Sequence, residues 1–118
     1  MPTSNYYIGA VLSGIREGRQ ITQKEVGEKF NASSSYISGL EHGNNGEINQ
    51  AILEFYSKLL DVPISDILDL ARQYEAEYGN GLYLEMPRDI IKRRLKHQYY
   101  RDRFEPRTRT IFKRKIGR

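Results

Sequence analysis

The most constraining feature of this 118-residue sequence is a pair of short, closely spaced helix signals in its first half. Thr22 and Glu25 have the spacing of a capping box, in which each side chain binds the backbone amide of the other residue and fixes a helix start. Asn31 tolerates the left-handed conformation that ends a helix. Ser33 then caps a second helix, which Gly43 ends. Two short helices separated by about three residues form a helix-turn-helix arrangement.

Three further helices are expected around this pair. Apolar residues recur every three or four positions over residues 4–18, from Asn49 to a break at Pro63, and over residues 65–78. This is the spacing of the buried face of a helix. The two clearest stripes are Ile8, Val11, Leu12 and Ile15, and Ile52, Phe55, Tyr56, Leu59 and Leu60. Residues 1–79 are therefore predicted to form one all-α domain of five helices.

The remaining residues, 80–118, are predicted to form a basic C-terminal extension. Residues 88–103 have the pattern of a sixth helix, with Ile91, Leu95 and Tyr99 on one face. After Pro106 there is no convincing period, and this last stretch is expected to be a flexible arm.

The charge of the chain is divided very unevenly between its two parts. Residues 1–87 carry 6 Lys and Arg against 12 Asp and Glu, whereas residues 88–118 carry 13 against 3. An acidic body with a basic tail suggests that the tail binds a polyanion or folds back onto an acidic face of the body. Charge alone does not choose between these two possibilities.

Composition argues against several classes of protein. The sequence has no Cys, which excludes disulfides, thiol catalysis and Cys-based zinc sites, and its two His residues lie far apart. The acidic residues show no paired spacing with a nucleophile or base. No apolar run approaches the roughly 20 residues of a membrane span, and the N-terminus lacks the shape of a signal peptide. We therefore expect a cytoplasmic, non-enzymatic protein with no cofactor, metal, membrane contact or evident small-molecule ligand.

The second helix of the pair carries the side chains that a DNA-reading helix needs. In a helix-turn-helix the first helix braces across the phosphate backbone, and the second lies in the major groove. Ile37 and Leu40 supply the buried face that anchors the second helix. The positions that face outward are Ser34, Ser35, Ser38 and Gly39.

This segment resembles the repressor/Cro (XRE) family of helix-turn-helix proteins. The matching positions are Thr22-Gln23, Val26-Gly27, Asn31-Ala32-Ser33, Ile37-Ser38, Glu41 and Gly43. The family has Thr-Gln, Leu-Ala, Gly-Val-Ser, Ile-Ser, Glu and Gly at the same spacings. The resemblance spans roughly residues 6–72 and implies the five-helix lambda-repressor-like DNA-binding fold.

The resemblance also implies roles for individual residues. Gln23 matches a position that binds a backbone phosphate, consistent with the affinity of helix N-termini for anions, and Ser33 matches a cap that also contacts phosphate. Arg16 and Glu41 match a structural ion pair that orients the second helix. The positions that usually face base edges are Ser34, Ser35, Ser38 and Gly39. The positions in the loop that meets the backbone again are Asn44 and Asn45.

Departures from the family pattern bear on specificity. Gly27 replaces an Ala, which costs roughly 1 kcal/mol of helix propensity but permits close helix approach. The outward positions hold serines and no Arg, Gln or Asn, so they offer no bidentate base contact. Specificity is therefore expected to draw on Tyr36 or His42, on DNA shape or on the arm. The arm residues expected to contact DNA are Arg103, Arg107, Arg109, Lys113, Arg114 and Lys115.

These observations favour a sequence-specific protein that binds double-stranded DNA and acts as a transcriptional repressor. Proteins of the family usually bind inverted repeats as dimers, so a homodimer is expected, through the fifth helix and Tyr74, Tyr78 and Tyr83. Two other functions stay open. One is a DNA-binding accessory factor of a mobile element, in conjugation, replication or recombination. The other is a protein-binding adaptor or antitoxin whose tail holds an acidic partner.

Overall fold

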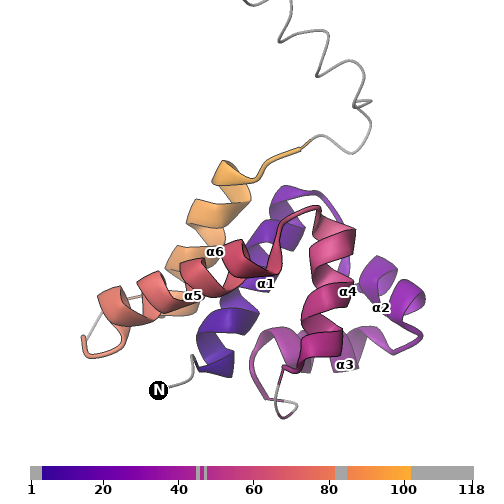
Figure 1. Ribbon diagram of the computed structural model, residues 1–118, viewed down its shortest axis with the longest axis horizontal. Coiled ribbons are helices and arrows are strands. Elements are labelled where there is room, and N and C mark those ends of the chain that lie inside the picture. Colours follow the sequence, from indigo (N-terminus) through magenta and orange to yellow (C-terminus); the bar gives the residue numbers. More distant parts are fainter. Residues whose placement is uncertain (1–3, 45, 47, 82–84, 102–118) are drawn as a thin grey trace, which may run out of the picture.

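The helices of this chain can be followed from one capping residue to the next. The computed structural model describes residues 4–44, 46, 48–81 and 85–101. Within these ranges the chain forms helices and no strand, which confirms the predicted all-α fold (Figure 1). The helices are α1 (Asn5–Gly18), α2 (Gln23–Phe30), α3 (Ser34–Glu41), α4 (Gln50–Leu60), α5 (Ile64–Tyr78) and α6 (Pro87–Gln98).

Polar side chains cap the first four helices. Thr22 and Glu25 form the predicted capping box: the Glu25 amide donates to Thr22 Oγ1 at 3.1 Å, and the Thr22 amide donates to Glu25 Oε1 at 3.0 Å. Ser4, Ser33 and Asn49 accept hydrogen bonds from first-turn amides of α1, α3 and α4. Each cap satisfies an amide that the helix leaves unpaired and contributes about 1 kcal/mol.

Left-handed residues terminate the helices around the motif. Asn31 has φ 59° and ψ 49°, as its position after α2 predicts, and Gly43 has φ 77° after α3. α4 ends at Leu60 because Asp61 adopts φ 60° and ψ 47°. The predicted break at Pro63 is therefore wrong by two residues. Pro63 instead stands just before α5, where a missing backbone amide leaves no helix hydrogen bond unmade.

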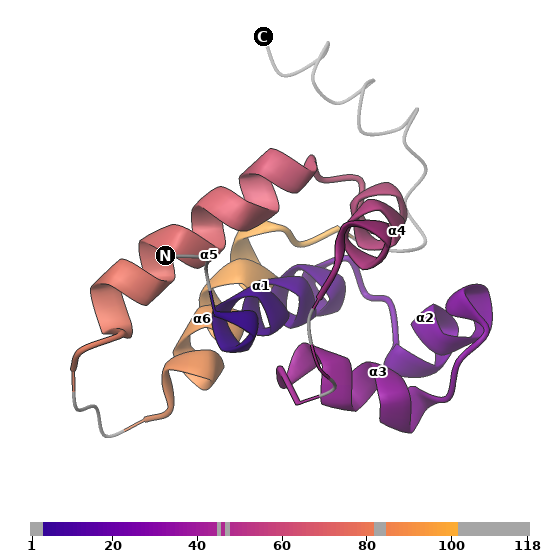
Figure 2. The ribbon, with the colours of Figure 1, turned by 60° about the horizontal axis from the view of Figure 1, so that its bottom comes forward.

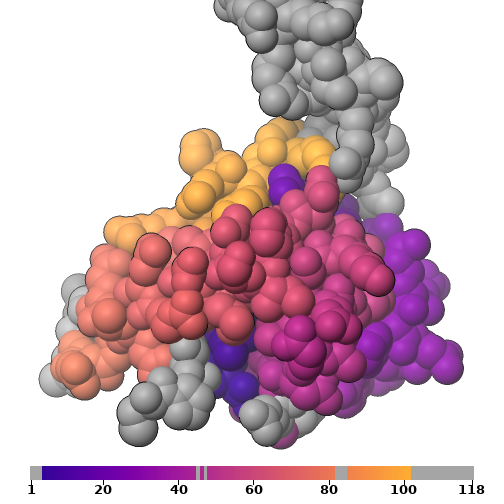
Figure 3. Space-filling view, in the orientation of Figure 1, coloured from indigo at the N-terminus to yellow at the C-terminus, as the bar shows by residue number. Residues whose placement is uncertain are grey.

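α1 is the central helix, and four other helices, α3, α4, α5 and α6, pack around it. Every residue from 7 to 16 is buried, which is the mark of a helix surrounded by protein on all sides. Figure 2 shows α1 in the middle of the bundle, with α5 and α6 on one side and α2 and α3 on the other. In the space-filling view only small parts of α1 are visible between α5 and α4 (Figure 3).

α6 completes this core and forms the most extensive helix pair of the molecule with α1. Ile91 and Leu95 on α6 are fully buried. Glycines on α1 let the two helices approach almost to backbone contact. A Cβ atom on Gly14 would lie 2.9 Å from Leu95 Cβ, and one on Gly18 would lie 2.9 Å from the Lys96 carbonyl oxygen. Part of the predicted extension is thus built into the same core as α1.

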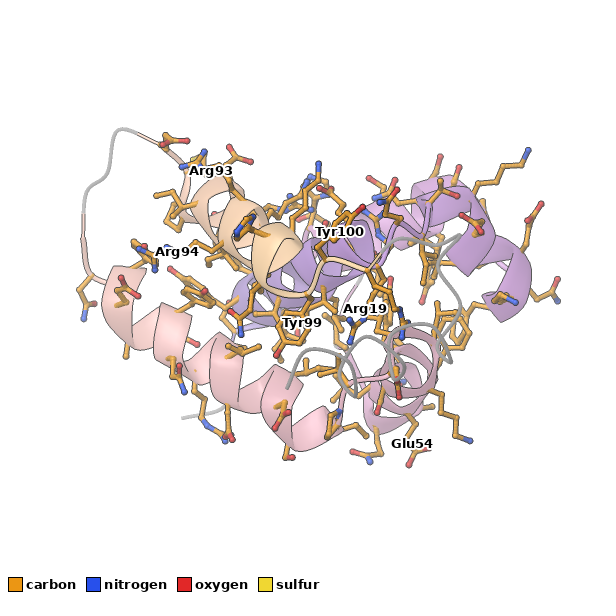
Figure 4. The ribbon with its side chains drawn as sticks, turned by 90° about the horizontal axis from the view of Figure 1, so that it is seen from above. Arg19, Glu54, Arg93, Arg94, Tyr99 and Tyr100 are labelled. Atoms are coloured by element: carbon orange, nitrogen blue, oxygen red, sulfur yellow. The ribbon has the colours of Figure 1, made fainter. Side chains whose placement is uncertain are left out.

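The end of α6 differs from the prediction. The helix stops at Gln98 rather than near residue 103, and the half-buried Tyr99 follows it. The Arg19 guanidinium lies 5.4 Å from the centre of the Tyr99 ring (Figure 4), and the Arg101 amide donates to the Gly18 carbonyl at 2.9 Å. These contacts hold the chain against the end of α1 and direct it away from the helical path.

Replacing Leu95 with Ala tests whether α6 is an integral part of the domain. The fully buried side chain packs against α1, so Leu95→Ala is expected to lower the free energy of unfolding by about 2–4 kcal/mol. Met86→Ala is the control, because Met86 is 61% exposed at the start of the same helix and should change stability by less than about 0.5 kcal/mol. Urea denaturation followed by circular dichroism measures both. Equal stability of Leu95→Ala and the wild-type protein would contradict the assignment.

Candidate nucleic-acid interface

The helix-turn-helix is held together by a tight turn and a small apolar seam. The Ala32 amide donates to the Gly27 carbonyl at 2.8 Å, which folds the turn back onto α2. A Cβ atom on Gly27 would lie 2.5 Å from the Ala32 carbonyl oxygen, so the close approach predicted for this glycine is present. Val26 of α2 and Ile37 and Leu40 of α3 are buried in the core. α3 is thereby fixed on one face and open on the other.

The open face of α3 is short and rich in hydroxyl groups. Ser33, Ser34, Ser35 and Tyr36 are exposed, whereas Ser38 and Gly39 are half-buried. Ser33 also caps the helix, because its Oγ accepts from the Tyr36 amide at 3.0 Å. At the far end the exposed His42 ring places Nδ1 2.7 Å from the Ser38 carbonyl oxygen. The outward face of α3 is thus polar from one end of the helix to the other.

Gln23 and Asn44, both expected to contact the DNA backbone, have different surroundings. Gln23 is half-buried, and its Nε2 donates to Glu41 Oε1 at 3.2 Å. Its amide is therefore held in place beside the first turn of α2. Asn44 is exposed directly after α3. Asn45 and the six arm residues, Arg103, Arg107, Arg109, Lys113, Arg114 and Lys115, lie outside the described residues.

A buried carboxylate fixes the orientation of α3. Arg16 and Glu41 form the ion pair that the resemblance implied, with Nε 2.8 Å from Oε2 and Nη2 3.0 Å from Oε1. Arg16 Nη1 also donates to the Ile21 carbonyl at 2.7 Å. Such a bidentate pair restricts direction as well as distance. It links α1 and the start of α2 to the last residue of α3.

Tyr56 adds a fourth element to this cluster, which the sequence did not predict. Its hydroxyl donates to Glu41 Oε2 at 2.8 Å from the buried face of α4. Burial raises the pKa of Tyr56 far above its usual range, and the neighbouring Glu41 carboxylate raises it further. The signal was present, because a tyrosine on an otherwise apolar helix face needs a partner for its hydroxyl.

Two of the predicted dimer contacts, Tyr74 and Tyr78, have little surface to offer a second copy. Both side chains are buried in the core of their own chain, with 8% and 7% of their surface exposed. Their rings stack with centroids 6.2 Å apart. They lie four positions apart on α5, and the face they share is mostly covered within the chain. Tyr83, the third predicted contact, lies outside the described residues.

Comparisons with known proteins agree on the class of the motif. A family model described as helix-turn-helix matches residues 13–67. The chain is 35% identical over 86 residues to the competence pilus inhibition repressor of Acinetobacter baylyi. The aligned region covers 71% of this chain and 76% of that protein. No solved structure shows a significant match. In the described part of the chain, none of the helices combines the length and apolar character of a membrane crossing.

The raised pKa of Tyr56 predicts a specific loss of stability at high pH. Above about pH 10, the ordinary tyrosine pKa, the unfolded chain loses this proton while the folded protein keeps it. The unfolded state then binds fewer protons, so stability falls by up to about 1.4 kcal/mol per pH unit. Tyr56→Phe removes this contribution and should flatten the decline.

Urea denaturation between pH 8 and 11 measures the effect. Tyr100→Phe is the matched control, because Tyr100 is exposed and lies outside the Glu41 cluster. A Tyr56→Phe protein whose stability declines as steeply as that of the wild type and the control would refute the assignment.

Proposed function

Because the chain belongs to the repressor/Cro-like (XRE) family of helix-turn-helix DNA-binding proteins, we propose that it represses transcription by occupying specific promoter DNA. α3 enters the major groove, and α2 braces across the backbone. The observation that carries the proposal is the exposed face of α3, held at a fixed angle by the buried Arg16–Glu41 pair. The repressor name of the Acinetobacter relative supports the direction of regulation.

The DNA contacts of this motif divide into reading and positioning contacts. Ser34, Ser35 and Ser38 face base edges, with Gly39 leaving room for close approach, and Tyr36 and His42 flank them. The contacts that hold the backbone are those of Gln23 and Ser33 at the starts of α2 and α3, and of Asn44 and Asn45 in the loop. Phosphate contacts position the protein, and contacts to base edges supply sequence preference.

The basic arm supplies general affinity that the body lacks. With 12 acidic against 6 basic residues, residues 1–87 are repelled by DNA at long range. The arm residues Arg103, Arg107, Arg109, Lys113, Arg114 and Lys115 compensate by contacting the backbone or a minor groove. Replacing the last five with Gln should reduce the salt dependence of log affinity by roughly 4 to 5 units. An unchanged salt dependence would show that the arm does not contact DNA phosphates.

The assembly on DNA is a homodimer on an inverted repeat. Two copies of α3 then meet half-sites about 34 Å apart, one helical turn of DNA. The two chains meet through a surface other than Tyr74 and Tyr78. Sedimentation velocity with a two-half-site duplex decides between this arrangement and a monomer.

The reading role of α3 is tested on DNA chosen by the protein itself. Selection from genomic fragments followed by footprinting yields an operator. Ser34→Ala with Ser35→Ala should weaken binding to that operator about tenfold, since each lost hydrogen bond contributes about 1 kcal/mol at most. Binding to a scrambled duplex should stay nearly unchanged. The control is Ser65→Ala with Gln73→Ala, two exposed positions on α5.

Different outcomes separate the possible failures of this proposal. Equal losses on operator and scrambled duplex mean that the serines contact phosphate rather than bases. Selection that retains no duplex at all overturns the DNA-binding role and favours a protein adaptor.

A further inference from the structure

Four residues of α6 and its end form a stripe along one side of a surface groove. Arg88, Lys92, Lys96 and Tyr100 are spaced four residues apart, so they share one face of the helix. All four line a hollow of about 950 Å³. The opposite side is formed by residues 22–23 at the start of α2 and by Ser38 and His42 of α3. α6 therefore faces the helix-turn-helix across this groove.

The groove is continuous with the reading face of α3. Ser34, Ser38 and His42 are also spaced four apart and share one face of α3, and the last two line the groove. A second hollow shares His42 and Arg88 with the first and reaches Asn44 in the loop after α3. A strand of DNA beside α3 would thus pass from the start of α2, along α6, to the α3–α4 loop.

Arg88 gives the groove an unmatched positive charge. The side chain is only 8% exposed, and its Nε has no hydrogen-bond partner. Its Nη2 is 3.5 Å from Ser13 Oγ, and among the described residues no carboxylate pairs with it. A buried guanidinium without a counter-ion is costly. An anion in the groove, which Arg88 lines, would supply the missing counter-charge.

Lys92 and Lys96 of α6 line the groove, whereas Arg93 and Arg94 lie outside it. Arg93 is paired with Glu85 at 3.0 Å and Arg94 with Glu77 of α5 at 3.6 Å, so their charge is met within the chain. Figure 4 shows Arg94 toward α5 and Tyr100 at the other end of α6. In the groove, Lys92 Nζ lies 2.9 Å from Glu17, while Lys96 has no ion-pair partner among the described residues.

The groove stays positive when its own acids are included. Its lining holds the cations Arg16, Arg88, Lys92 and Lys96 and the acids Glu17 and Asp89. Because Arg16 is already paired with the buried Glu41, three positive charges remain against two negative ones, a surplus of one that favours a polyanion. Successive stripe residues rise about 6 Å along α6, which allows them to follow a chain of phosphates.

We propose that this groove binds the sugar–phosphate backbone of the duplex that α3 reads, with Arg88, Lys92 and Lys96 as phosphate contacts. The inference rests on the proposed function, because the same duplex must lie against α3. It adds a phosphate-binding site to the domain itself, separate from the arm. Its contacts are independent of base sequence and strengthen operator and non-operator binding alike.

The test compares two double variants of the full-length chain that change net charge equally. Lys92→Gln with Lys96→Gln removes two groove cations, and Arg93→Gln with Arg94→Gln removes two cations from the rest of α6. Fluorescence anisotropy over a salt series measures affinity for the selected operator and a scrambled duplex. The groove variant should lower the salt slope of log affinity by roughly 2 units on both duplexes, and the control should leave it nearly unchanged.

Arg88→Met provides a second, independent test of the groove. Because the buried guanidinium lacks a carboxylate, the free protein should keep its Tm or gain in Tm, while its DNA affinity falls. A lower Tm with unchanged affinity would show that Arg88 is structural only. Equal salt slopes for the two double variants, with wild-type binding intact, would overturn the proposal that the groove binds the DNA backbone. A wild-type chain that binds neither duplex refutes the proposed function instead.

Discussion

The orientation of α3, the second helix of the helix-turn-helix, depends on a single buried carboxylate. Glu41 is fully buried at the last residue of α3, and it accepts hydrogen bonds from Arg16 of α1, Tyr56 of α4 and Gln23 of α2. A buried charge of this kind adds little net stability but tolerates only one arrangement of its partners. Side chains from four helices thus meet at Glu41, and their contacts set the angle of α3. The exposed serines carry no such constraint and take their direction from this cluster.

The local features of the fold were predictable because their causes are local. The capping box at Thr22 and Glu25 and the left-handed Asn31 depend on residues within a few positions of one another. The Arg16–Glu41 pair was accessible only through family resemblance, since its residues are 25 positions apart. The break at Pro63 was misplaced because Asp61, a less obvious left-handed residue, ends α4 first.

Long-range packing decided the features that the sequence did not predict. Tyr74 and Tyr78 have a spacing equally suited to a dimer interface and to a core, and only the position of neighbouring helices shows that they are covered. In the sequence Tyr56 is one of several residues on the apolar face of α4, and only the packing of α3 brings Glu41 beside its hydroxyl. Likewise, the four-residue spacing on α6 was visible in the sequence, but the groove that it faces exists only because α1 brings α3 and α6 together and α2 packs on α3.

The glycine seam between α1 and α6 has a consequence for how the protein is made. α1 leaves the ribosome before α6, yet Gly14 and Gly18 are covered by α6, which ends at residue 98. One flank of the central helix therefore stays open to water until residue 98 has been synthesised. α3 contacts that same central helix through the Arg16–Glu41 pair. The support of the helix-turn-helix is therefore complete only after α6 has been synthesised.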